Sequence, residues 1–195
     1  MKTYERTIEA PLLEIRHDEN GVSPRDDDNL GYFISVDQRS YYSPDDHDTL
    51  VSIVKETGGE ARSQEEHIRM IKKEVEDQVQ EKVLAIYPIT KYEHGGVNYS
   101  LGRTSGFDYS ANGFYIVTDK TAEVTGVSKE NFEKVIKAEL NIYNKYANGE
   151  VYCYTLFDED GEVQDSCGGF YDIEDIKEYL PKEWEDVDLE EYYTD

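Results

Sequence analysis

An excess of acidic side chains limits what this chain can fold into. Its 195 residues include 44 aspartates and glutamates against 20 lysines and arginines, which gives a formal charge of −24. Such a charge with few apolar residues is typical of disordered chains, because too little apolar surface is buried to offset the entropy of ordering. However, 17 tyrosines, 6 phenylalanines and 1 tryptophan supply aromatic surface for a core. We therefore expect a folded, very acidic protein.

The composition also argues against several classes of protein. A broad negative surface repels phosphate, so binding to free DNA is not expected. No apolar run approaches the ~20 residues of a membrane-spanning helix, and the first residues lack the apolar core of a secretory signal. Cys153 and Cys167 are too few for a disulfide framework or a four-cysteine zinc site. These features predict a cytoplasmic protein with no membrane partner.

The acidic residues are concentrated towards the C-terminus. Residues 158–195 hold 16 acids and 2 lysines, a net charge of −14. Within residues 183–193 the acids alternate with bulky apolar side chains, which favours either a solubilising tail or an acidic aromatic arm that docks on a basic protein surface. The second interpretation makes Trp184, Glu185 and Asp186 candidate binding residues. We expect a single domain over residues 1–180, followed by an acidic tail over residues 181–195.

Local patterns predict two main helices and a hairpin. Ser63 followed by Glu66 is a capping box, which predicts a helix over residues 63–82. A second helix is expected over residues 129–147, with apolar side chains at helical spacing and a stop at Asn148-Gly149. The C-terminal hairpin is predicted to turn at Asp160-Gly161, a pair typical of type I′ turns.

The strand pattern sets the fold class. Strands are expected at residues 10–16, 30–36, 83–89 and 112–118, where β-branched and aromatic residues gather. A short apolar element at residues 50–55 should end at Gly58-Gly59. Because strands outnumber helices and neighbouring strands are joined by hairpins, we predict an α+β fold with an antiparallel sheet.

Two histidine clusters are the candidates for acid–base chemistry. His17 is followed by Asp18, and His94 precedes Arg103 and Asp108 in a glycine-rich stretch. A histidine can act as general acid or base, while an arginine stabilises charge on a phosphate. The alternative is that both clusters are polar loops built from turn-forming residues, with no chemistry of their own.

A third polar cluster contains a cysteine and neighbouring carboxylates. Cys167 precedes Gly168-Gly169, but a reactive thiol needs a positive field to lower its pKa, and this segment is acidic. The aspartates within residues 26–28 and 45–48 could hold Mg²⁺ or Ca²⁺, but they lack the spacing of an EF-hand. We predict no metal site and no cofactor, and leave a requirement for Mg²⁺ open.

Ordered blocks of this sequence resemble a protein family carried by phages, plasmids and conjugative elements. The family's usual forms are close to YPLYLYDHSG, WDSGQVGFIYV and DSCWGFYG. The corresponding blocks here are Ile86-Tyr87-Pro88-Ile89, Tyr92-Glu93-His94-Gly95-Gly96, Phe107-Asp108-Tyr109-Ser110, Gly113-Phe114-Tyr115 and Asp165-Ser166-Cys167-Gly168-Gly169-Phe170-Tyr171. The resemblance covers most of residues 12–172. Gly95, Phe107 and Gly168 depart from it, because Ser, Trp and Trp are usual there.

The resemblance implies an anti-defence function. Similar small mobile-element proteins include type II-A anti-CRISPRs, among them a group that inhibits Cas9 by truncation of its guide RNA. It therefore implies Cas9 with its guide RNA as partner, in the cytoplasm of a bacterial host. A protein of charge −24 would also be attracted to the basic channel in which Cas9 holds nucleic acid.

Two sets of residues follow from this implied function. In the RNA-truncating version the catalytic candidates are His17, His94, Arg103 and Asp108. The opening residues Arg16-His17-Asp18-Glu19 and Ser23-Pro24-Arg25 also fit the family. The candidate binding residues are Arg16, Arg25, Asp165 and Tyr171. The alternative function is an acidic DNA mimic that inhibits a restriction enzyme, and a third is a phage host-adaptation protein without a defence target. A mimic needs carboxylates ordered along a folded face, which the C-terminal tail is not expected to provide.

Overall fold

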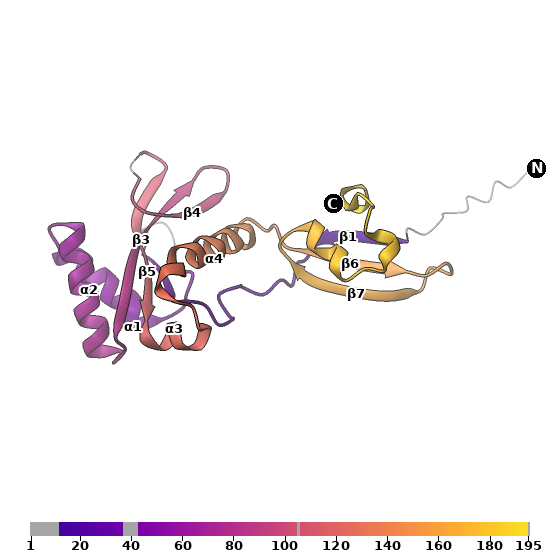
Figure 1. The fold of residues 1–195 in the computed structure, drawn as a ribbon. Coiled ribbons are helices and arrows are strands. Elements are labelled where there is room, and N and C mark those ends of the chain that lie inside the picture. Colours follow the sequence, from indigo (N-terminus) through magenta and orange to yellow (C-terminus); the bar gives the residue numbers. More distant parts are fainter. Residues whose placement is uncertain (1–11, 37–42, 105, 195) are drawn as a thin grey trace, which may run out of the picture. The chain divides into compact units, whose positions relative to one another are not determined.

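The computed structural model describes residues 12–36, 43–104 and 106–194 (Figure 1). It combines helices with antiparallel sheets, which confirms the predicted α+β fold class. The chain divides into two compact units. We call Ser23–Asn144 the central unit, and Met1–Val22 together with Lys145–Asp195 the terminal unit. The first two residues of the strand predicted at 10–16 lie outside the described residues.

The central unit is built on a four-stranded antiparallel sheet in the order β2-β5-β3-β4. Its strands are β2 (Tyr32–Ser35), β3 (Val83–Glu93), β4 (Val97–Leu101) and β5 (Tyr109–Thr118). Three of them confirm strands predicted from sequence. The fourth, β4, was not predicted, because its five residues contain little of the β-branched pattern that marks the others.

Both faces of this sheet are covered by helices, as Figure 1 shows for α2 (Gln64–Gln78) on one side and α4 (Phe132–Ala147) on the other. Phe114 and Ile116 of β5 belong to the core under the first two helices, while Tyr115 and Val117 belong to the core under α4. A strand buried on both faces has a continuous apolar sequence rather than an alternating one. This explains the unbroken run of bulky residues in β5.

Four α-helices and one 3₁₀ turn complete the central part of the chain. They are α1 (Asp48–Glu60), α2 (Gln64–Gln78), α3 (Asp119–Thr125), η1 (Lys129–Asn131) and α4 (Phe132–Ala147). The predicted start of α2 is confirmed, since the Ser63 hydroxyl accepts from the Glu66 amide at 3.1 Å. The Glu66 carboxylate in turn accepts from the Arg62 amide at 2.9 Å. The helix ends at Gln78, before the predicted residue 82.

The prediction that the element after residue 50 stops at Gly58-Gly59 is wrong. Helix α1 continues through both glycines to Glu60, and one face of it is buried. Each glycine costs a helix about 1 kcal/mol, which burial of Leu50, Ile53 and Val54 outweighs. Gly58 has a packing role, because a Cβ there would lie 3.1 Å from the ring of His67 on α2.

The second predicted helix is confirmed as α4, preceded by the single turn η1. Phe132, Ile136 and Leu140 on its buried face complete one core of the central unit. The helix stops before Gly149, which adopts the left-handed conformation at φ +77° that favours glycine.

The terminal unit holds its own three-stranded antiparallel sheet, so the described residues form two sheets where one was expected. The strands are β1 (Leu13–His17), β6 (Tyr152–Phe157) and β7 (Val163–Phe170), in the order β1-β6-β7. The predicted hairpin is confirmed, but the type I′ turn is wrong. Only Gly161 in the turn has a positive φ, and its amide donates to the Asp158 carbonyl at 3.0 Å. The Asp158 carboxylate also accepts from the amides of Asp160 and Glu162, which favours this wider turn.

Residues 181–194, expected as part of a tail, fold onto this sheet. Three 3₁₀ segments lie in the C-terminal region: η2 (Ile173–Glu178), η3 (Lys182–Trp184) and η4 (Leu189–Tyr192). Trp184 is 8% exposed and Leu189 0% exposed. The Thr194 amide donates to the Ile15 carbonyl at 2.8 Å, which ties the chain end to β1. The boundary of a single domain at residue 180 stays a prediction, to be tested by unfolding.

Within the described part of the chain, no helix is both long enough and apolar enough to cross a membrane.

Candidate functional site

The most concentrated charge in the structure lies on the C-terminal segment of the terminal unit. Between residues 172 and 191, ten carboxylate side chains are exposed to solvent. We call this set the acidic face. Its members are Asp172, Glu174, Asp175, Glu178, Glu183, Glu185, Asp186, Asp188, Glu190 and Glu191.

The acidic face is held in place by buried apolar residues that alternate with the acids. These anchors are Ile173, Ile176, Leu180, Trp184 and Leu189. They pack against Leu13, Ile15, Tyr154, Leu156 and Phe170 of the sheet. Because an anchor recurs every three to five residues, the backbone between anchors is short and the carboxylates project from fixed positions.

Few cations compensate the acidic face. Lys145 pairs with Asp172, and Lys177 pairs with Glu174 at 2.8 Å. Apart from Lys177, residues 172–191 contain one other basic residue, Lys182. A dense set of like charges on a folded surface creates a potential that attracts cationic partners and raises their rate of association. This arrangement suits binding to a basic surface.

The structure separates the candidate binding residues of this segment. Glu185 and Asp186 are exposed members of the acidic face. Trp184 was expected to contact a partner, but its ring is buried in the core. It packs edge-on against Tyr192 at a centroid distance of 5.1 Å. Its contribution is to anchor the segment, so it has little surface to offer a partner.

Two other candidate binding residues stabilise the fold of the terminal unit. Asp165 accepts a hydrogen bond from the Tyr154 hydroxyl at 2.7 Å and another from the Ser166 amide at 2.9 Å. Burial and the Asp165 carboxylate raise the pKa of Tyr154, so that hydroxyl stays protonated. The Tyr171 hydroxyl donates to the Val22 carbonyl at 3.4 Å, and thereby ties β7 to the segment after β1.

Arg25 was also expected to contact a partner, but its side chain is only 4% exposed. Its guanidinium pairs with Asp45 at 2.6 Å and with Glu139 at 3.1 Å, and donates to the Gly31 carbonyl at 2.6 Å. Burial acts to lower the pKa of Arg25, but the Asp45 carboxylate more than offsets it and the net shift is upward. Arg25 therefore connects the loop before α1, the residue that precedes β2, and α4 inside the central unit.

The first histidine cluster lies at the end of β1, where Arg16 and His17 are exposed. The His17 ring stacks on Tyr152 at 5.2 Å. Asp18 does not orient it, because its two oxygens accept from the amides of Asn20 and Gly169, each at 2.9 Å.

A polar cavity of about 450 Å³ lies beside these residues and includes Cys153. Burial raises the pKa of the Cys153 thiol, which disfavours the reactive thiolate. Cys167, the cysteine singled out from sequence, is exposed on β7.

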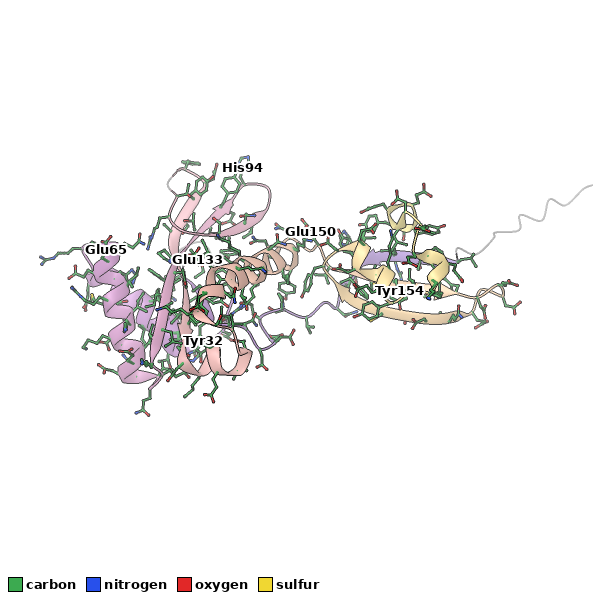
Figure 2. The ribbon with its side chains drawn as sticks, viewed as in Figure 1. Tyr32, Glu65, His94, Glu133, Glu150 and Tyr154 are labelled. Atoms are coloured by element: carbon green, nitrogen blue, oxygen red, sulfur yellow. The ribbon has the colours of Figure 1, made fainter. Side chains whose placement is uncertain are left out.

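The second histidine cluster is only partly assembled. His94, at the end of the β3–β4 hairpin (Figure 2), lies with Nδ1 3.8 Å from Asp108 Oδ2, and its side chain is 74% exposed. Arg103 instead donates to the Ala111 carbonyl, and its guanidinium carbon lies 5.4 Å from the ring centre of Phe114. Burial lowers the pKa of Arg103. Among the described residues, Arg103 therefore contacts Ala111 and Phe114 and not His94.

The predicted catalytic residues fall into different units. His17 belongs to the terminal unit, while His94, Arg103 and Asp108 belong to the central unit. Within the central unit the structure brings together His94 and Asp108 alone. A catalytic role for these four residues stays a prediction.

One carboxylate that could have held a metal, that of Asp45, has partners within the fold. Asp45 accepts from Arg25 and from the Phe33 amide at 2.7 Å. Among the residues that the structure describes, no group of three or more His, Cys, Asp or Glu side chains is placed to hold a metal ion.

No family model, curated protein or solved structure matches this chain.

Sequence reasoning missed the order of the acidic face after residue 180, although a signal was present. The anchors from Ile173 to Leu189 recur at intervals that fit short helical turns, and a solubilising tail would not need them.

Proposed function

We propose that this protein is an anti-defence inhibitor of a mobile genetic element, and that it inhibits type II-A Cas9 by binding a basic surface of the effector in the bacterial cytoplasm. The observation that carries the proposal is the acidic face, in which ten exposed carboxylates are fixed by buried anchors. The resemblance of the ordered sequence blocks supplies the identity of the target.

Fixed carboxylates suit this role for an energetic reason. A disordered acidic arm must lose conformational entropy when it binds, whereas side chains on a folded segment have lost most of it already. Cas9 holds its guide–target duplex in a positively charged channel and contacts it through the backbone. A rigid set of negative charges would compete for that channel without any bond being broken.

The geometry favours stoichiometric binding over RNA cleavage. An acid–base site needs its groups to converge on the reacting atoms, whereas His17 belongs to the other unit and Arg103 contacts Ala111 and Phe114 rather than His94. Truncation of the guide RNA remains an alternative outcome, in which Cas9 presents the RNA to the inhibitor.

A second candidate function gains support from the same observation. An antirestriction DNA mimic requires carboxylates ordered along a folded face, which were not expected from the sequence. The folding of residues 181–194 onto the terminal unit meets that requirement. The target, either Cas9 or a restriction endonuclease, distinguishes the two candidates.

One experiment separates these possibilities. Purified protein is mixed with Cas9 and guide RNA, DNA cleavage is measured, and the RNA is run on a denaturing gel beside a lane without Cas9. We expect blocked cleavage and intact guide RNA. Shortened guide would establish the truncating version, and His17→Ala and His94→Ala would then test the histidines.

A parallel assay with a restriction endonuclease tests the alternative. Normal Cas9 cleavage together with an inhibited endonuclease would replace the proposed target by the alternative one. Normal activity of both enzymes would refute both proposals.

A further inference from the structure

An aromatic ring projects into solvent from the central unit. Phe107 is 92% exposed, the highest value among the large apolar side chains that the structure describes as exposed. It lies in the turn that leads into β5, next to Tyr109, which is also partly exposed. Exposed apolar residues are common singly, so this ring needs further evidence before a function can be assigned.

The first piece of evidence is the rigidity of the turn. The Tyr109 amide donates to the Gly106 carbonyl at 3.3 Å, and the Asp108 carbonyl accepts from the Glu93 amide of β3 at 3.0 Å. The backbone on both sides of Phe107 is therefore hydrogen-bonded. An apolar side chain on an ordered turn loses less entropy on binding than one on a flexible loop.

The second piece of evidence is the aromatic support beneath the turn. The Tyr109 ring packs on Tyr92 of β3 at a centroid distance of 5.0 Å. Gly106 lies directly on the Tyr109 ring, since a Cβ there would come within 2.8 Å of Tyr109 Cδ2. The turn rests on this pair of rings, and Phe107 extends beyond it. Rigid aromatic residues of this kind dominate the energy of protein interfaces.

The third piece of evidence is local charge. Residues 91–109 contain four charged side chains in 19 positions, Lys91, Glu93, Arg103 and Asp108, whereas charged residues make up 33% of the whole chain. Charged residues are depleted from the centres of protein interfaces. The segment around Phe107 thus has the composition of an interface centre.

We propose that Phe107 is an anchor that inserts into an apolar pocket on a basic protein partner. The net charge of the chain indicates why the partner should be a basic protein. A second copy of the chain, a nucleic acid and an anionic membrane are all negative and would be repelled by the net charge of −24. This inference rests on the proposed function, and makes the same partner contact the central unit through an apolar group.

Phe107→Ala tests the proposal without risk to the fold, because the side chain contacts mainly solvent. Binding to the Cas9–guide RNA complex is measured by calorimetry for the wild type, for Phe107→Ala and for Phe107→Leu. Val124→Ala is the matched control, since Val124 is an exposed apolar residue of the same unit on α3. We expect Phe107→Ala to weaken binding by about 10- to 100-fold. Phe107→Leu should retain most of the affinity, and Val124→Ala all of it.

The outcomes distinguish this inference from the proposed function. If the wild type binds Cas9 and Phe107→Ala binds equally well, the inference is wrong and the proposed function stands. If the wild type does not bind, both are refuted. Sedimentation of the free proteins tests whether Phe107 instead contacts a second copy of the chain. A dimer in the wild type that is lost in Phe107→Ala would assign the ring to self-association and overturn the proposal.

Discussion

The two units of this protein contain the same number of acids and use them differently. Each has 22 aspartates and glutamates, but the central unit has 14 lysines and arginines and the terminal unit only 6. Their formal charges are −8 and −16. The difference in net charge therefore comes from the smaller number of bases in the terminal unit, and the structure shows what the acids do in each unit.

In the central unit, key carboxylates are partners inside the fold. Asp45 and Glu139 hold Arg25, and the buried Glu81 accepts from the hydroxyls of Tyr32 and Thr118. In the terminal unit the acids of the acidic face project outwards from a thin core. Acids therefore stabilise the first unit, whereas in the second they are available to a partner at a cost in self-repulsion.

The largest effect is expected from removing the cation at the centre of this internal network. Arg25→Met should lower the free energy of unfolding of the central unit by about 3–5 kcal/mol, because Asp45 and Glu139 would be left without their buried partner. Urea unfolding followed by far-UV circular dichroism measures it, since all four α-helices lie wholly or mainly in this unit. Arg62→Met, at an exposed position, is the control and should change the stability by less than about 0.5 kcal/mol.

The next effect tests whether the acidic face depends on its anchors. Leu189→Ala should destabilise the terminal unit by about 2–5 kcal/mol, because Leu189 is fully buried in its core. Trp184, the sole tryptophan, reports on this unit by fluorescence. Leu140→Ala alters the core of the central unit instead. If the units unfold independently, Leu140→Ala leaves the fluorescence transition in place. A common shift in both variants would support the predicted single domain.

The smallest effect concerns alkaline pH and the central unit alone. Burial, with the nearby Glu81 carboxylate, raises the pKa of Tyr32 from 10.0 to about 12. A group whose pKa is higher in the folded state stabilises the fold fully below its unfolded pKa. That stabilisation is lost as the pH rises from 10 to about 12. Tyr32→Phe should therefore be less stable at neutral pH, but should lose less stability across this window. An equal loss in both proteins would contradict the assignment.

Much of the fold could be predicted because its signals are local. The Ser63–Glu66 capping box and the β5 run specify structure within a few residues. The two-sheet architecture could not be predicted, because the pairing of β1 with β6 joins residues about 140 positions apart. The fate of the C-terminal segment depends on the same distant contact, since Leu189 and Trp184 pack on β1 and β6.

The candidate site was predicted less well than the fold. Glu185 and Asp186 could be assigned to a binding surface from charge alone, because exposed carboxylates need no tertiary partner. Arg25 and Trp184 could not be assigned correctly, since whether such a side chain faces a partner or the core depends on packing that the sequence does not display. The predicted acid–base site at His94 likewise depended on the position of the Arg103 side chain, which is set by contacts with Ala111 and Phe114.

Two variants that each lose three negative charges, one in each unit, test whether the acidic face is the surface that binds the partner. One variant carries Glu183→Gln, Glu185→Gln and Glu191→Gln in the terminal unit. The other carries Glu56→Gln, Glu60→Gln and Glu123→Gln at exposed positions of the central unit. Both remove three negative charges with nearly isosteric side chains, so they alter the overall charge equally.

Affinity for the Cas9–guide RNA complex is measured for both variants at several salt concentrations. We expect the terminal-unit variant to bind about tenfold more weakly than the wild type, and its affinity to depend less on salt concentration. The affinity of the central-unit variant should stay close to that of the wild type. Equal weakening in the two variants would mean that only the net charge matters, and would contradict the claim that the acidic face is the binding surface.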